Sequence, residues 1–153
     1  MLTFDLVKSE ISNIGVSLSN SEINTLIRDN STAVFVSLDT FNQIDGSFKE
    51  YATSLKPFRD NSLSVYRSNS LDNIGDPSNL ITLEVFDIDT PFVQTQEAAV
   101  DTSVGEIHFL TSFNKDSEYI YLRFSVVDIE GIVQDTLLRS GLKDRVTEER
   151  RGN

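Results

Sequence analysis

The spacing of apolar residues changes along this chain, and that change limits the folds it can adopt. Up to about residue 30 the apolar residues recur every three or four positions, which is the period of one helix face. From residue 33 onward most of them alternate with polar residues or stand in short β-branched runs, as in strands. The chain has 153 residues, the length of one domain. We therefore predict one α+β domain with short N-terminal helices and a mostly antiparallel sheet of about five to six strands.

The first helix is predicted over residues 4–14. Thr3 precedes it as a possible N-cap, and Gly15 follows its last turn, where a left-handed residue commonly ends a helix. Its apolar face consists of Phe4, Val7, Ile11 and Ile14. Residues 2–6 also alternate as a strand would, but that pattern is shorter than the helical one.

Two capping boxes predict further helix starts. Ser19 and Glu22 stand three positions apart, so each side chain can bond the other residue's backbone N–H, and the apolar face behind them is Ile23, Leu26 and Ile27. Ser47 and Glu50 have the same spacing, and apolar residues continue from them at near-helical intervals until Pro57. We expect a second helix after Ser19 and a third one after Ser47.

Strand patterns occupy most of the remaining sequence. Residues 33–38 and 63–67 predict two short strands, and residues 80–88, which are apolar on both faces, predict a central strand. Residues 107–113 and 119–129 flank a short polar loop, which predicts a hairpin. Between these segments, residues 89–104 carry no clear pattern. A stretch of that length is either a surface loop or an interaction arm, and Phe92 and Val93 lie in it.

Charge divides the chain into an acidic body and a mixed C-terminal segment. Residues 1–131 carry eight basic and twenty acidic side chains, a net charge of −12, whereas residues 132–153 carry five basic and four acidic ones. The apolar residues of the second segment recur at helical spacing, namely Val133, Leu137 or Leu138, Leu142 and Val146. We predict a body over residues 1–131 and a C-terminal amphipathic helix or extended arm over residues 132–153.

Several kinds of chemistry lack the residues that they need. The chain has no cysteine and one histidine, His108, so we interpret His108 as structural and expect no zinc site of ordinary composition. No Gly-x-Ser-x-Gly elbow, phosphate-binding glycine loop or dinucleotide fingerprint occurs. We therefore predict no catalytic residues, no metal site and no cofactor, and the protein is expected not to be an enzyme.

The paired aspartates at the end of the 80–88 segment are the best candidate for chemistry. Over four residues, Asp87-Ile88-Asp89-Thr90 resembles the strand-end motif of haloacid-dehalogenase phosphatases, and that resemblance would imply phosphoryl transfer. The glycine of that motif is missing, and the threonine stands one position early. We interpret Asp87 and Asp89 as turn-forming residues, with binding of a hard cation as the alternative.

Targeting signals are not evident in the sequence. No apolar run approaches the ~20 residues that a membrane span requires, and residues 1–6 lack the basic start of a secretory signal. The net charge of −11 disfavours binding to a phosphate backbone. We expect an intracellular or virion protein that contacts neither membrane nor nucleic acid directly.

These patterns favour a structural or adaptor subunit of a larger protein assembly. Ser, Thr and Asn account for 42 residues, a composition common in virion proteins such as phage connectors, tail proteins and decoration proteins. The expected contacts are to further copies of the chain or to other subunits. The predicted partner-binding residues are Leu138, Leu142, Arg145, Val146, Arg150 and Arg151 of the tail, with Phe92 and Val93 of the long loop.

The acidic body suggests an alternative. A strongly negative protein can act as an inhibitor or nucleic-acid mimic that occupies a basic groove on its partner. Such a protein should bind its partner in a strongly salt-dependent way, whereas an assembly subunit should associate with itself or with a neighbour.

Overall fold

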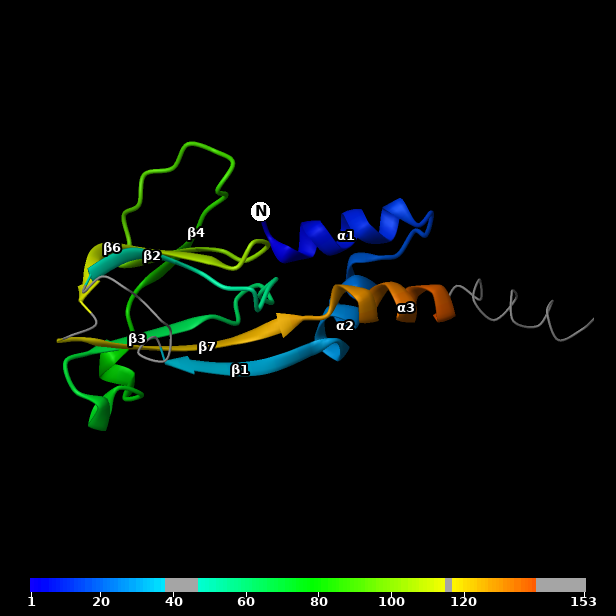
Figure 1. Ribbon diagram of the computed structural model, residues 1–153. Coiled ribbons are helices and arrows are strands. Elements are labelled where there is room, and N and C mark those ends of the chain that lie inside the picture. The colour runs from blue at the N-terminus through cyan, green and yellow to red at the C-terminus, as the bar shows by residue number, and fades with distance from the viewer. Residues whose placement is uncertain (38–46, 115–116, 140–153) are drawn as a thin grey trace, which may run out of the picture.

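The computed structural model describes residues 1–37, 47–114 and 117–139, and these residues form an α+β fold (Figure 1). The predicted class, the N-terminal helices and the C-terminal helix are confirmed. The helices are α1 (Thr3–Asn13), α2 (Asn20–Asp29) and α3 (Ile129–Arg139), and short 3₁₀ turns cover η2 (Leu71–Asn73) and η3 (Pro77–Asn79). The strands are β1 (Ser31–Ser37), β2 (Ser47–Ala52), β3 (Ser64–Ser68), β4 (Leu83–Val85), β5 (Ala98–Asp101), β6 (Glu106–Asn114) and β7 (Tyr119–Val127).

The described strands form two sheets that lie as separate layers in Figure 1. One sheet has the order β1-β7-β3 and is antiparallel. The other has the order β2-β6-β5-β4, in which β4 and β5 run parallel. Alternate residues of each strand face the other layer and form one apolar core. Its buried members are Tyr51, Phe58, Leu63, Val65, Ala98, Val100, Ile107, Phe109, Ile120, Leu122 and Phe124.

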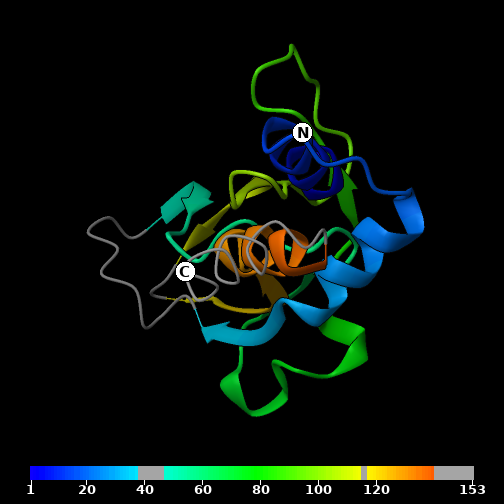
Figure 2. The same cartoon turned by 90° about the vertical axis from the view of Figure 1, so that its right-hand side faces the viewer.

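The three helices gather at one end of the two sheets (Figures 1 and 2). They build a second core, which includes the last residue of β7: Val7, Ile11, Ile23, Leu26, Ile27, Val127 and Ile132. The apolar faces predicted for α1 and α2 are the ones that are buried. No described helix has both the length and the apolar character that a membrane crossing requires.

Local capping signals work largely as predicted. The Ser19 hydroxyl accepts from the Glu22 N–H and the Glu22 carboxylate accepts from the Ser19 N–H, both at 3.1 Å. Gly15 follows α1 with φ 78°, a left-handed conformation that suits glycine. The prediction for Thr3 is wrong by one position. Leu2 is the N-cap of α1, and Thr3 is the first helical residue, with its hydroxyl donating to the Phe58 carbonyl at 2.5 Å.

Because Leu2 has no side chain that can cap a helix, a carboxylate from elsewhere in the chain caps α1. Asp60 accepts from the Thr3 N–H at 2.9 Å with one oxygen and from the Phe4 N–H at 2.8 Å with the other. The Thr102 hydroxyl, which follows β5, donates to the same carboxylate at 2.5 Å. Asp60 therefore ties the start of α1 to the four-stranded sheet.

The third predicted helix is wrong, because residues 47–52 form the strand β2. Its capping-box spacing is a local signal, and pairing with β6 overrides it. In the strand, Tyr51 lies opposite Ile107 and both are buried in the core between the sheets.

The predicted strand arrangement is also corrected in three places. The segment 80–88 contains only the three-residue strand β4, at an edge of its sheet instead of its centre. The patternless stretch 89–104 contains β5, a strand of four buried residues between β4 and β6. Strands β6 and β7 do not form the predicted hairpin, since they belong to different sheets. Strand β5 is buried on both faces, so it shows no alternation of polar and apolar residues. Strands β6 and β7 pair with strands that are distant in sequence, β6 with β2 and β7 with β1 and β3, and local patterns do not reveal such pairing.

The first residues of the predicted arm are part of the body. Gly131 lies inside α3, Ile132 is 1% exposed in the helical core, and Arg139 lies 3.9 Å from the Asp29 carboxylate of α2. The C-terminal helix or arm over residues 132–153 stays a prediction as a separate unit, because residues 140–153 lie outside the described residues.

Replacing Asp60 tests the anchor of α1. We expect Asp60→Ala to lower the free energy of unfolding by about 1–3 kcal/mol, because the Phe4 N–H loses its carboxylate acceptor and the Thr3 N–H keeps only its 3.3 Å contact with the Thr102 hydroxyl. Urea unfolding measures this change. Asp5 is an exposed acid in the first turn of the same helix, so Asp5→Ala is the control and should cost no more than about 1 kcal/mol. Equal losses in the two variants would contradict an anchoring role for Asp60.

Candidate functional site

The segment between β4 and β5, residues 86–97, rises from the body (Figures 1 and 2). We call it the β4–β5 loop. Several of its apolar side chains are exposed to solvent. Val93 is 84% exposed, and Ile88 and Phe92 are about 40% exposed, at 41% and 39%. Exposed apolar residues that cluster on one segment mark a contact site more often than isolated ones do.

Hydrogen bonds to Glu84 hold the C-terminal end of this loop. Its carboxylate accepts from the Thr95 hydroxyl at 2.8 Å, from the Gln96 N–H at 2.6 Å and from the Thr95 N–H at 3.3 Å. Desolvation would raise the pKa of the Glu84 carboxyl, but these hydrogen bonds outweigh it and lower that pKa below its ordinary value.

Asp101 holds the N-terminal end of the loop. It is 1% exposed at the end of β5, and one oxygen accepts from the Ile88 N–H at 2.9 Å. The other oxygen accepts from the Ser103 hydroxyl at 2.8 Å, and the Met1 ammonium lies 3.1 Å from the carboxylate. Burial would raise the pKa of Asp101, but the hydrogen bonds and the ammonium together lower it.

Ring contacts support the loop from beneath. Phe86 is buried, and its ring stacks on the Phe92 ring with 5.1 Å between the centroids. The Phe86 ring also contacts the His108 ring, with 4.6 Å between those centroids. The Gln94 amide donates to the His108 carbonyl at 3.1 Å and to the Gln96 carbonyl at 2.9 Å. The loop is therefore an ordered support, from which Val93 projects.

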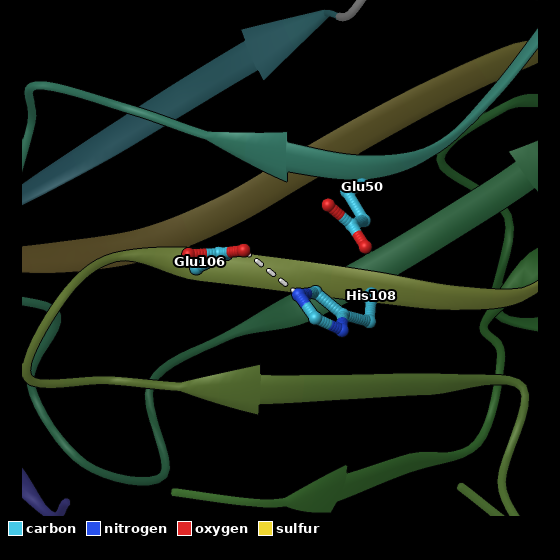
Figure 3. Close-up of side chains that lie close together, drawn as sticks. All are labelled: Glu50, Glu106 and His108. Carbon is cyan, nitrogen blue, oxygen red and sulfur yellow. Dashed lines mark hydrogen bonds and ion pairs between the residues drawn. The ribbon is translucent and has the colours of Figure 1, made fainter. Parts of the chain in front are cut away.

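A group of polar side chains lies on the same sheet as the base of the loop (Figure 3). Glu106 and His108 of β6 and Glu50 of β2 place one donor atom each within 4.8 Å of one another. His108 Nε2 lies 2.8 Å from a Glu106 oxygen, and since a carboxylate accepts hydrogen bonds, Nε2 carries the proton of this bond.

The predicted partner-binding residues fall into two regions. Phe92 and Val93 lie on the β4–β5 loop, whereas Leu138 is 44% exposed near the end of α3. Figure 1 places the loop and α3 at different ends of the molecule. The remaining predicted residues, Leu142, Arg145, Val146, Arg150 and Arg151, lie outside the described residues.

Asp87 and Asp89 form a turn at the start of the loop. The Asp87 carboxylate accepts from the Asp89 N–H at 3.0 Å, and the Thr90 hydroxyl donates to the Asp87 carbonyl at 3.1 Å. These bonds are the ones expected of turn-forming aspartates.

Sequence reasoning missed the residues that order the loop and the group around His108. Glu106 and His108 are two positions apart, so a strand places them on one face, and this signal was present in the sequence. Glu50 gave no such signal, because the segment that contains it was assigned to a helix.

Comparison with known proteins adds no identification. No protein-family model matches this chain, and neither a curated protein nor a solved structure shows significant similarity to it. The arguments about function therefore rest on the residues and contacts described above.

Removing the Glu84 carboxylate should loosen the loop. We expect Glu84→Ala to speed amide hydrogen exchange of Thr95 and Gln96 at least about tenfold, since that corresponds to losing about 1.4 kcal/mol of local stability. Exchange measured by NMR tests this, with Glu84→Gln as an intermediate case. Glu97→Ala removes a neighbouring acid whose contact with Thr82 is long, at 3.4 Å, and should leave the two amides unchanged.

The lowered pKa of Asp101 predicts acid sensitivity. Its ordinary value is 3.8, so the carboxylate stabilises the fold above about that pH, and this contribution is lost as the pH falls through the lowered pKa. We expect Asp101→Asn to be less stable than the wild type at pH 6, and this difference to shrink towards pH 2. Urea unfolding at both pH values measures it, and a difference independent of pH would contradict the assignment. Asp76→Asn, at an exposed position without a side-chain cap bond, is the control.

Proposed function

We propose that this protein is a non-enzymatic structural or adaptor subunit of a larger protein assembly, such as a phage connector, tail or decoration protein of a virion. In this proposal the chain acts inside a cell or in a particle assembled there. The observation that carries the proposal is the β4–β5 loop, which is held by hydrogen bonds at both sides and presents Val93 to solvent.

An ordered apolar loop is well suited to binding another protein. Burying one aliphatic side chain such as Val93 contributes about 1.5–3 kcal/mol. Because Glu84, Asp101 and Phe86 already order the loop, little conformational entropy is lost on binding, and more of that contribution appears as affinity.

The C-terminal segment supplies the second proposed contact. Leu138, which is exposed on α3, would lie with Leu142 and Val146 in a groove of a neighbouring subunit. Arg145, Arg150 and Arg151 would meet the acidic body of that neighbour, whose residues 1–131 carry a net charge of −12.

The contacts of the acidic side chains favour this proposal over an acidic mimic. A nucleic-acid mimic presents free carboxylates to a basic groove, whereas several carboxylates here bond their own chain. Asp60, Glu84 and Asp101 accept backbone N–H groups, and Glu118 pairs with Arg67 at 2.6 Å.

Substituting Val93 tests the proposed contact. We expect Val93→Asp to weaken self-association or binding to an assembly neighbour by about 10- to 100-fold, the fold-change that corresponds to the apolar contribution above. Light scattering after size-exclusion chromatography, at several protein concentrations, measures self-association. Leu71→Asp is the control, because Leu71 is 50% exposed on η2, outside the loop.

A second arm of this experiment tests the C-terminal segment. The truncation should end at Arg139, because a cut after Gly131 would remove the buried Ile132 from the helical core. A defined oligomer that falls to monomers on truncation supports assembly through the tail. The proposal would be overturned in favour of the acidic mimic by two results together. The full-length and truncated chains would both be monomers, and the protein would bind a basic protein in a salt-dependent way that Val93→Asp does not change.

A further inference from the structure

The pairing of β2 with β6 turns three metal-ligand side chains to one face. Glu50 is the direct cross-strand partner of His108, and Glu106 precedes His108 by two residues. Their neighbours Tyr51 and Ile107 point into the core between the sheets, so these three side chains point to the opposite, outer face. Figure 3 shows them converging from the two strands.

The spacing of the donor atoms is close to that of a metal centre. The three atoms lie within 4.8 Å of one another, and the Glu106 oxygen and His108 Nε2 are 2.8 Å apart. Two ligands each about 2.1 Å from a tetrahedral Zn²⁺ are roughly 3.4 Å apart. Since Glu50 is exposed, rotation of its side chain can close the remaining distance.

The local charge favours a cation. Glu50 and Glu106 are diagonal neighbours on one face of the strand pair, so two negative charges share a small area and repel each other. Among the described residues, no ion pair connects Glu50 or Glu106 to a lysine or arginine. Lys49 lines a surface pocket together with Glu50 and His108 but forms no such pair with them. A bound divalent ion would neutralise both carboxylates.

The surroundings of His108 hold it in place as a ligand. Its ring lies 4.6 Å from the Phe86 ring, and its carbonyl accepts from the Gln94 amide. His108 and Glu106 are partly shielded, with side chains 25% and 20% exposed, whereas Glu50 faces solvent. The site therefore has two positioned ligands, a third that can swing and an open path for an ion.

We propose that Glu50, Glu106 and His108 bind a divalent transition-metal ion, for which Zn²⁺ is the best match. An imidazole together with two carboxylates suits Zn²⁺, whereas Ca²⁺ and Mg²⁺ prefer oxygen ligands alone. Three protein ligands leave a fourth position for water. When the ion binds Nε2, the proton of the neutral His108 ring would move to Nδ1, and the ion would bridge β2 to β6 beneath the β4–β5 loop.

The full-length chain provides a clear test, because His108 is its only histidine. Titration with ZnCl₂ should shift the single set of imidazole signals in the NMR spectrum and saturate at one ion per chain. Zn²⁺ at a hundredfold excess over its dissociation constant should raise Tm by about 5–10 °C. The same concentration of MgCl₂ or CaCl₂ should produce no shift.

Matched variants show whether these ligands bind the ion. Glu50→Gln and Glu106→Gln should each weaken Zn²⁺ binding at least about tenfold in calorimetry, since even the loss of a residue that only supports a ligand typically costs about 10- to 100-fold. Glu130→Gln removes one exposed charge on α3 and should bind as the wild type does. Imidazole signals that do not respond to Zn²⁺, or variants of Glu50 and Glu106 that bind it normally, would overturn the proposal. Since no measurement here depends on self-association, this result is independent of the proposed assembly function.

Discussion

The position of α1 depends on one carboxylate that comes from outside the helix. The helix begins at a buried threonine and has leucine at its N-cap, so its first N–H groups lack a local acceptor. Asp60 supplies this acceptor and also bonds Thr102 after β5. An N–H group without a partner costs up to about 1–3 kcal/mol when it is buried, so Asp60 helps to fix where α1 meets the four-stranded sheet. The chain around Asp60 also carries Phe58, whose ring packs on Phe124 of β7 with 4.2 Å between centroids.

Strand β5 connects this anchor to the exposed loop. All four of its residues are buried, and its last residue, Asp101, accepts from the Ile88 N–H at the start of the β4–β5 loop. The next residue, Thr102, belongs to the network that caps α1. The loop and the first helix are therefore held by adjacent residues, and the order of the loop follows from the packing of the core. For this reason the loop that carries Val93 is ordered, although the Val93 side chain itself is almost fully exposed.

The outer face of the four-stranded sheet carries both features that we associate with function. Phe86 stacks on Phe92 of the loop on one side and contacts His108 of the proposed metal site on the other. Gln94 links the same two features through its hydrogen bond to the His108 carbonyl. An ion that draws β2 and β6 together would therefore act directly beneath the apolar contact surface. The two proposals remain separable, because one depends on apolar burial and the other on ligand chemistry.

Local patterns predict the α+β class, the faces of α1 and α2, the Ser19–Glu22 capping box and the glycine at the end of α1. Each of these follows from the spacing of residues that are near one another in the chain. The fold, in contrast, made residues 47–52 a strand, placed β5 inside a sheet and assigned β6 and β7 to different layers. It also decided that Asp60 caps a helix 56 residues away and that Glu50 meets His108. Most of these features depend on contacts between residues that are far apart in the chain, such as β2 with β6 or Asp60 with α1. Such contacts outweigh local propensity and leave little trace in the spacing of neighbouring residues.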